Sequence, residues 1–263
     1  YDGTASGNPQ VTSGKVNQAL DFDGYDDQVT IDPFADLSGG LVTVTAWVYP
    51  QSAPNRFSNV ISLADQTGSG RSNSVLIQHR GEDAGDPFLF GADDGTGNVA
   101  SVTSGWIGTG DWHHVALTQD GDYLTAYLDG TEIGSVEVED RISVSTNVAR
   151  IAQNAIGNSV TLYDAKIDDV RIYGRTLSAD EIDLLASNLV VPAEYDTIQN
   201  AIDDADSGDT IVVESGSYEE DLTVNVEDLT LEGPNAGICG DEDSRGDEAT
   251  IVGQVVLSAA GTT

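Results

Sequence analysis

Residues 111–134, with the sequence DWHHVALTQDGDYLTAYLDGTEIG, constrain the fold more than any other stretch of the chain. Two runs in which apolar side chains recur at every second position are joined at Asp120-Gly121. An Asp-Gly between two alternating runs is the strongest short-range signal for a β-hairpin. A second Asp-Gly, at 129–130, turns the chain into residues 131–138. The stretch therefore predicts an antiparallel β-meander.

The same alternation continues through the first two thirds of the chain. In residues 41–50, LVTVTAWVYP, small aliphatic side chains alternate with threonine and aromatic ones, so a strand here has one aliphatic face. Further short strands are predicted at 19–31, 59–63, 74–79, 87–90, 99–103, 149–153 and 160–173, with Gly- and Asp-rich loops between them. Many short strands without interleaved helices predict an all-β fold, an antiparallel sandwich or jelly roll.

Helical signals appear only after this region. Ser178 and Glu181 have capping-box spacing, which predicts a short helix, and residues 189–192 predict a linker ending in Pro192. A second helix, capped by Asp196, is predicted from the apolar stripe of Ile198, Ala201, Ile202 and Ala205. Short strands then follow at 210–214, 222–226, 229–232, 250–252 and 254–258.

The charge balance restricts both environment and partners. The chain has 45 acidic against 10 basic side chains, for a formal net charge of −35. Self-repulsion of this size destabilises a compact state in dilute buffer, whereas molar salt shortens the screening length to about 3 Å. An acidic surface with only two lysines is similar to the surfaces of proteins from extreme halophiles. The phosphate backbone of a nucleic acid would be repelled, and no apolar run is long enough to span a membrane.

A family resemblance rests on four strings in order: ALDFDGYDDQVTI, VTAWVYP, DWHHVALTQDGDYLTAYLDG and AKIDDVRIYGRTLSADEI. Together they resemble a laminin-G-like, concanavalin A-like jelly-roll domain, which we place at residues 1–190. The usual opening strand is missing before Tyr1, so we expect a processed or excised piece of a longer protein. The resemblance implies a fold, while members of such families bind glycans, bind proteins or space other domains.

Residues 191–263 resemble a different family. The run YDTIQNAIDDADSGDTIVVESGSYEEDLTV, followed by LTLEGPNAGI and EATIVG, resembles the cap helix and first rungs of a right-handed parallel β-helix of the pectate-lyase-like type. A solenoid rung must be covered by the next one. We therefore expect the last rung to be covered by further polypeptide or by another chain, which leaves self-association or stacking on the open end as an alternative.

Aromatic side chains on the non-aliphatic face form the candidate glycan site. Flat rings beside hydroxyl groups suit stacking and hydrogen bonding to a pyranose if the strands are neighbours. The alternative is that these rings cover a curved sheet or pack under loops. Arg56, Arg71 and Arg80 are arginines that an acidic sugar could recruit. The predicted glycan-binding residues are Trp47, Tyr49, Trp112, His114, Tyr123 and Tyr127.

Acidic residues supply a candidate metal site. In laminin-G-like domains the acidic positions of the DFDGYDD string and of the Asp168-Asp169 pair can hold a structural calcium, which implies Asp23, Asp27 and Asp168 as ligands. The alternative is that Asp23 and Asp27 are turn residues whose carboxylates bond their own backbone. Neither string has EF-hand spacing.

Catalytic motifs are not found in the sequence. It contains no G-x-S-x-G nucleophile elbow, no H-E-x-x-H and no P-loop. His113 and His114 are adjacent on a strand and point to opposite faces, so they do not bind one metal together. We therefore predict no catalytic residues in this segment, although active groups on later rungs of a β-helix remain an alternative.

These observations predict a non-enzymatic adhesion or recognition module. We expect an extracellular, cell-surface or virion-surface location, in a haloarchaeal surface or filament protein or in a haloarchaeal virus fibre, with a polysaccharide or cell-surface glycan as partner. Two alternatives are a carbohydrate-binding appendage of a β-helical polysaccharide lyase or hydrolase, and a structural subunit of an extracellular filament.

Overall fold

The computed structural model describes most of the 263-residue chain, which divides into two compact units, Tyr1–Asp183 and Leu184–Thr263. The described residues are 3–16, 18–31, 37, 40–53, 57–64, 74–81, 87–93, 99–105, 107–138, 148–153, 162–192, 195–205, 207–235 and 246–258. In this part of the chain no helix is long and apolar enough to cross a membrane.

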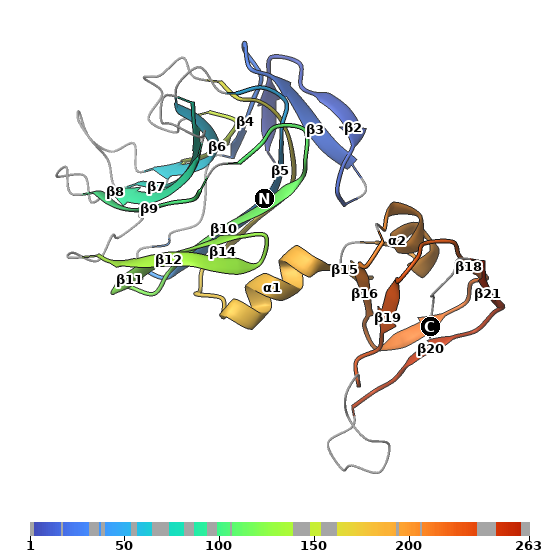
Figure 1. Ribbon diagram of the computed structural model, residues 1–263. Helices are drawn as coiled ribbons and strands as arrows, with labels where there is room; N and C mark the ends of the chain where they lie inside the picture. Colours follow the sequence, from blue (N-terminus) through green and yellow to red (C-terminus); the bar gives the residue numbers. More distant parts are fainter. Residues whose placement is uncertain are drawn as a thin grey trace. The chain divides into compact units, whose positions relative to one another are not determined.

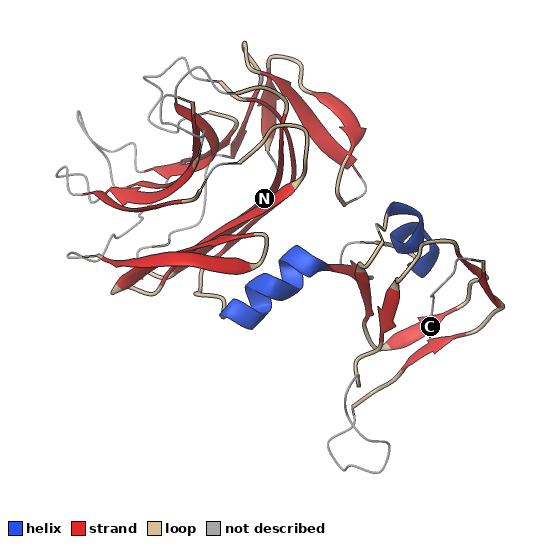
Figure 2. Cartoon of the chain, viewed as in Figure 1, coloured by secondary structure: helices blue, strands red, loops and turns tan. Residues whose placement is uncertain are grey.

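The first unit is a β-sandwich of two seven-stranded antiparallel sheets (Figure 1). Strands make up nearly all of its regular structure (Figure 2). Sheet A has the order β1 (Thr4–Ser6), β4 (Gln28–Ile31), β13 (Val148–Ile151), β6 (Phe57–Ala64), β7 (Ser74–Arg80), β8 (Phe88–Asp93) and β9 (Val99–Thr103). Sheet B has the order β12 (Thr131–Glu137), β11 (Tyr123–Leu128), β10 (His113–Gln119), β5 (Val42–Pro50), β14 (Asp164–Tyr173), β3 (Gln18–Asp23) and β2 (Gln10–Ser13). The predicted all-β jelly-roll sandwich is confirmed.

The predicted meander forms one edge of sheet B. β10 pairs with β11, and β11 pairs with β12. In the first turn Gly121 has φ 99°, and the Asp120 carboxylate accepts the N–H groups of Asp122 and Tyr123. The second turn has positive φ at both Asp129 and Gly130, 49° and 76°. Paired positive φ values match the right-handed twist of the flanking strands, which is why Asp-Gly marks the second turn, whereas the first turn has positive φ at Gly121 alone.

The core lies between the two sheets. The aliphatic faces of β5, β10 and β11 point into it, with the exposed fraction of Val44, Leu117 and Leu124 at 1% or less. Sheet A contributes Phe88 and Phe90 among others. Each such side chain contributes about 1.5–3 kcal/mol through removal from water, so this interface dominates the stability of the unit.

One polar pair is buried in the same core. The Tyr163 hydroxyl lies 2.7 Å from Nδ1 of His79, and both residues are fully buried. Burial, reinforced by the nearby Asp164 carboxylate, raises the pKa of Tyr163 well above its ordinary value. The hydroxyl therefore stays protonated and forms a hydrogen bond with the imidazole.

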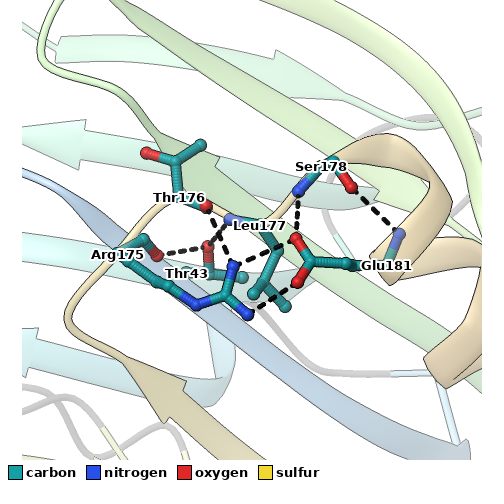
Figure 3. Close-up of polar contacts among 6 residues, drawn as sticks. All are labelled: Thr43, Arg175, Thr176, Leu177, Ser178 and Glu181. Carbon is teal, nitrogen blue, oxygen red and sulfur yellow. Dashed lines mark hydrogen bonds and ion pairs between the residues drawn. The ribbon is translucent and has the colours of Figure 1, made fainter. Parts of the chain in front are cut away.

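The predicted capping box begins α1 (Ala179–Ser187), as Figure 3 shows. The Ser178 hydroxyl accepts the N–H of Glu181, and the Glu181 carboxylate accepts the N–H of Ser178. The Arg175 guanidinium donates to both oxygens of the same carboxylate. These hydrogen bonds lower the pKa of Glu181 to about 2, so the carboxylate stays ionised in the capping box.

The second unit is built from short parallel strand pairs. β15 (Asn188–Val191), β16 (Thr210–Val213) and β19 (Thr230–Glu232) form one sheet, β17 (Gly216–Tyr218) pairs with β20 (Ala249–Ile251), and β18 (Leu222–Val224) pairs with β21 (Val255–Leu257). The interpretation of residues 189–192 as a linker is wrong, because Leu189 to Val191 pair with β16 and are buried.

The helix predicted in this unit is α2 (Ile198–Asp204), and its apolar stripe is buried at Ile198, Ala201 and Ile202. The predicted cap is one residue early. The Thr197 hydroxyl, not the Asp196 carboxylate, accepts the N–H of Asn200. Thr197 has extended backbone angles, and its hydroxyl lies three residues before the donor, as an N-cap requires.

Candidate functional site

The predicted ring face lies on the outer side of sheet B, opposite the aliphatic face that enters the core. The strands are neighbours, as the glycan prediction required, because β5 lies between β10 and β14. The register places His114 on one side of Trp47 and Asp168 on the other. Lys166 lies beside Tyr49, two residues further along β5.

Three of the predicted glycan-binding residues are buried on this face. The exposed fraction is 8% for Trp47, 5% for Tyr127 and 1% for His114. The expectation that these rings face the solvent is therefore wrong. Alternation along a strand identifies the face of the sheet to which a side chain belongs, but it does not indicate whether other parts of the chain cover that face.

The cover over Trp47 comes from the connection between β2 and β3. The N–H of Val16 donates to the Asp168 carboxylate at 2.8 Å. Asp168 lies on β14 directly beside Trp47, so this bond holds the β2–β3 connection next to the Trp47 ring. The Nζ atom of Lys15, in the same connection, lies 5.6 Å from the centroid of that ring. At the other end of β5, the segment before α1 covers Thr43, whose hydroxyl accepts the N–H of Leu177.

Burial shifts the pKa of two groups on this face. Loss of solvation, partly offset by the Asp129 carboxylate, lowers the pKa of His114 to about 4. Its ring lies edge-on to Trp47 at 5.3 Å, and its Nδ1 has no hydrogen-bond partner among the described residues. Burial also raises the pKa of Asp168 to about 6, although backbone N–H groups stabilise the carboxylate.

His113 is half-buried at the start of β10. Its Nδ1 lies 3.0 Å from a carboxylate oxygen of Asp129. The second oxygen of Asp129 accepts the N–H of His114. Asp129 therefore contacts the ring of His113 and the backbone of His114, while the His114 ring lies against Trp47.

Two rings on this face, those of Tyr49 and Trp112, are partly exposed. Their centroids are 5.5 Å apart with the planes at 59°. The Nζ atom of Lys166 lies 5.3 Å from the centroid of the Tyr49 ring. We call Lys15, Trp47, Tyr49, Trp112 and Lys166 the ring–lysine cluster.

Tyr123 does not belong to this cluster. It is 47% exposed and is the first residue of β11. The next residue, Leu124, pairs with Gln119 of β10, which in turn pairs with Val42 at the start of β5. Tyr49 is seven residues further along β5, which corresponds to roughly 23 Å of extended strand. The predicted glycan residues therefore do not line a single groove.

The predicted arginines lie elsewhere. Arg56 and Arg71 lie outside the described residues, and Arg80 ends β7 in sheet A. Lys15 and Lys166 instead lie over the rings of Trp47 and Tyr49. The sequence shows that these are the chain's only lysines, but their ring contacts depend on the pairing of β14 with β5 and on the path of the β2–β3 connection.

The structure brings Asp23 and Asp27 together, with Asp26 as the third member. One carboxylate oxygen of each lies within 4.8 Å of the others, a spacing that suits oxygen ligands of calcium at 2.3–2.6 Å. Both oxygens of Asp27 also accept backbone N–H groups, from Asn8 and Asp23. The turn role considered for these residues is therefore present.

Asp168 does not join this acidic group. Asp23 pairs with Asp164 on β14, and Asp168 lies four residues further along, roughly 13 Å away along an extended strand. Its carboxylate bonds the Val16 and Asp169 N–H groups instead. The three-residue ligand set that the resemblance implied is thus separated in the fold.

Comparison with known proteins agrees with this architecture. Residues 23–183, more than half of the chain, match the family model described as the concanavalin A-like lectin/glucanases superfamily. No curated protein matches the chain.

Several solved structures are similar. Domain 4 of AbnA, an extracellular GH43 arabinanase from Geobacillus stearothermophilus solved with arabinotriose, is 19% identical with a TM-score of 0.56, over 70% of this chain and 87% of that one. A SAP-like pentraxin from Limulus polyphemus is 15% identical with a TM-score of 0.53, over 64% and 81% of the two chains. The binding domain of Paraclostridial Mosquitocidal Protein 1 is 14% identical with a TM-score of 0.56, over 71% of this chain and 47% of that one. At these identities the likeness shows the fold alone.

Proposed function

The chain belongs to the concanavalin A-like lectin/glucanase superfamily, and from this premise we propose that its first unit is a non-catalytic glycan-binding module. The observation that supports this proposal most directly is the partly exposed pair of Tyr49 and Trp112 on the outer face of sheet B. Tilted aromatic rings at a strand end offer a pyranose an apolar surface with polar groups close by. A structural relative, domain 4 of the arabinanase, was solved with a bound oligosaccharide.

The test is a glycan array in molar NaCl with matched ring variants. Trp112→Ala should abolish binding. Tyr123→Ala, which removes an exposed ring from the far end of the same sheet, should leave binding intact. An array without any glycan signal for the wild-type protein, or equal effects of the two variants, would contradict the proposal.

For the second unit we propose the first rungs of a right-handed parallel β-helix. Support comes from the strand pairs, all of which are parallel and join residues 20 to 33 positions apart, as in Thr210 with Thr230 and Ser217 with Thr250. We place the domain boundary near residue 190, while contacts divide the chain at Asp183 and Leu184.

The proposed setting is an extracellular, cell-surface or virion-surface protein of a halophile, either a haloarchaeal surface or filament protein or a virus fibre. The net charge of −35 supports a high-salt environment. Structural relatives include extracellular and toxin binding domains, which agrees with an external location.

A structural role in a filament is the alternative with a specific observation in its favour. Four apolar side chains near the end of the described chain are 42–56% exposed, namely Val252, Val255, Val256 and Leu257. A second copy stacked on these strands would cover them. Mass measurement in molar salt tests this alternative, and a strict monomer would contradict it. A β-helical lyase or hydrolase with this unit as its carbohydrate-binding appendage would need catalytic groups on further rungs.

A further inference from the structure

Both lysines of the chain lie over aromatic rings of the same sheet face. Lys15 lies over Trp47 and Lys166 over Tyr49, at 5.6 and 5.3 Å from nitrogen to ring centroid. The chain has only 10 basic side chains against 45 acidic ones, so two cations on adjacent rings form an unusual concentration of positive charge. Trp47 and Tyr49 are two residues apart on β5 and therefore project from the same face.

The lysines and rings form one continuous strip across three strands. Trp112 packs against Tyr49 from the β10 side, and Lys166 lies beside Tyr49 on β14. Tyr49, Trp112, Lys15 and Lys166 are each half-buried, so part of every side chain reaches solvent. A ligand that stacks on the Trp112 and Tyr49 rings would therefore lie within reach of an ammonium group.

The net charge of the chain does not prevent an anion from binding here in molar salt. With a screening length of about 3 Å, only charges in direct contact with the ligand matter. Two carboxylates near the strip already accept hydrogen bonds, Asp21 from the Gln51 side chain and Asp168 from the backbone of Val16 and Asp169. Lys166, whose ammonium group lies over the partly exposed Tyr49 ring, is well placed to contact an anionic substituent.

We propose that the ligand of the ring–lysine cluster is an acidic saccharide, which carries a carboxylate or sulfate group that pairs with Lys166 while its sugar ring stacks on Trp112 and Tyr49. This inference rests on the proposed glycan-binding function and names its ligand class. Lys15, over Trp47 at the other end of the strip, provides a second cation for the next acidic residue of a polymer.

The test measures binding in molar NaCl to two matched pairs of probes. The first pair is an oligogalacturonate and its methyl ester, and the second is dextran sulfate and dextran. Within each pair the two members share one sugar backbone, so a difference in affinity reports on the charged group. The first pair tests a carboxylate as the source of the anion, and the second tests a sulfate.

Lys166→Met is the informative variant, because it removes the charge but keeps a long apolar stem over Tyr49. It should weaken binding of the preferred acidic probe roughly tenfold, the loss expected for one charge-assisted hydrogen bond, and Lys166→Arg should retain the preference. The matched control is Arg175→Gln, which also removes one positive charge. Arg175 lies just beyond Tyr173, at the end of β14 far from Lys166, where Tyr173 pairs with Thr43. Near-UV circular dichroism confirms that each variant is folded.

The outcomes separate this inference from the proposed function. Tighter binding of an acidic probe, lost in Lys166→Met and kept in Arg175→Gln, supports the inference. Equal binding of the members of both pairs overturns the acidic ligand, and an acidic preference that Lys166→Met leaves unchanged overturns the pairing with Lys166. Both outcomes leave glycan binding standing. No binding of these probes or of any glycan on the array, charged or neutral, overturns both.

Discussion

Thr43 holds the segment before α1 against the outer face of sheet B, and Thr43→Val should destabilise the first unit. The Thr43 side chain is fully buried. Its hydroxyl donates to the carbonyl of Arg175 and accepts the N–H of Leu177, both at 2.9 Å (Figure 3). Valine keeps the shape of the side chain and removes both hydrogen bonds, so the variant isolates their contribution.

The expected loss follows from the surroundings of the two partners. The bond to Leu177 is buried, so its N–H is left without a partner at a cost of about 1–3 kcal/mol. Arg175 is exposed, and water can replace most of the lost bond to its carbonyl. We therefore expect the free energy of unfolding to fall by roughly 2–3 kcal/mol.

Thr45→Val is the matched control, two residues along the same strand and on the same face. Thr45 is also fully buried, but its hydroxyl has no hydrogen-bond partner among the described residues. Removal of a buried polar group that is not bonded is neutral or favourable, so this variant should keep the stability of the wild type or gain up to about 1 kcal/mol.

The assay is urea unfolding in molar NaCl, followed by tryptophan fluorescence. Urea is uncharged and leaves the ionic strength unchanged. All three tryptophans precede residue 113, so the signal reports on the first unit alone. Equal destabilisation by the two variants would show that the two hydrogen bonds of Thr43 do not determine the loss of stability, and would refute the reasoning.

Three further predictions follow from charge. Dialysis of the wild-type protein from molar salt into dilute buffer should abolish its near-UV circular dichroism, because the net charge of −35 is then unscreened. A retained spectrum would contradict the proposed halophilic setting. The pKa of His114 is about 4 in the folded state against an ordinary 6.5, so the unfolded state binds more protons between these values and the free energy of unfolding falls as the pH falls from 6.5 toward 4. His114→Phe should therefore flatten the dependence of stability on pH in this window. An NMR titration of His114 near 6.5 would contradict the burial. Calcium should raise the urea concentration at the unfolding midpoint of the wild type. Asp26→Asn should reduce this shift, and the substitution leaves the hydrogen bonds that Asp23 and Asp27 make to the backbone in place. A midpoint that responds neither to calcium nor to a chelator would argue for a turn role alone.

Features set by neighbouring residues were predictable from the sequence. The Asp-Gly turns follow from backbone preferences within four residues, and the capping box from the spacing of Ser178 and Glu181. The aliphatic faces of β5, β10 and β11 follow from period-two alternation. Asp23 and Asp27 are close in the sequence, so their proximity was also predictable.

Features set by distant segments were not predictable in this way. Trp47 was expected in the solvent, but it lies under a connection held by the bond from Val16 to Asp168, 152 residues apart. The bond from Leu177 to Thr43 joins residues 134 apart. β15 was interpreted as a linker because three apolar residues before a proline carry no strand signal of their own. Its burial depends on parallel pairing with β16, which local patterns do not reveal.

The two lysines illustrate how one residue type can have a structural and a binding role at the same site. A lysine stem covers apolar ring surface while its ammonium group stays in water, and the shorter stems of aspartate and glutamate do this less well. The retention of Lys15 and Lys166 in so acidic a chain therefore has a structural reason that requires no ligand. For this reason the stem and the charge must be separated experimentally. If Lys166 acts only as a cover for Tyr49, methionine replaces it without any change in ligand preference, whereas a role in binding makes the preference for an acidic saccharide depend on the charge.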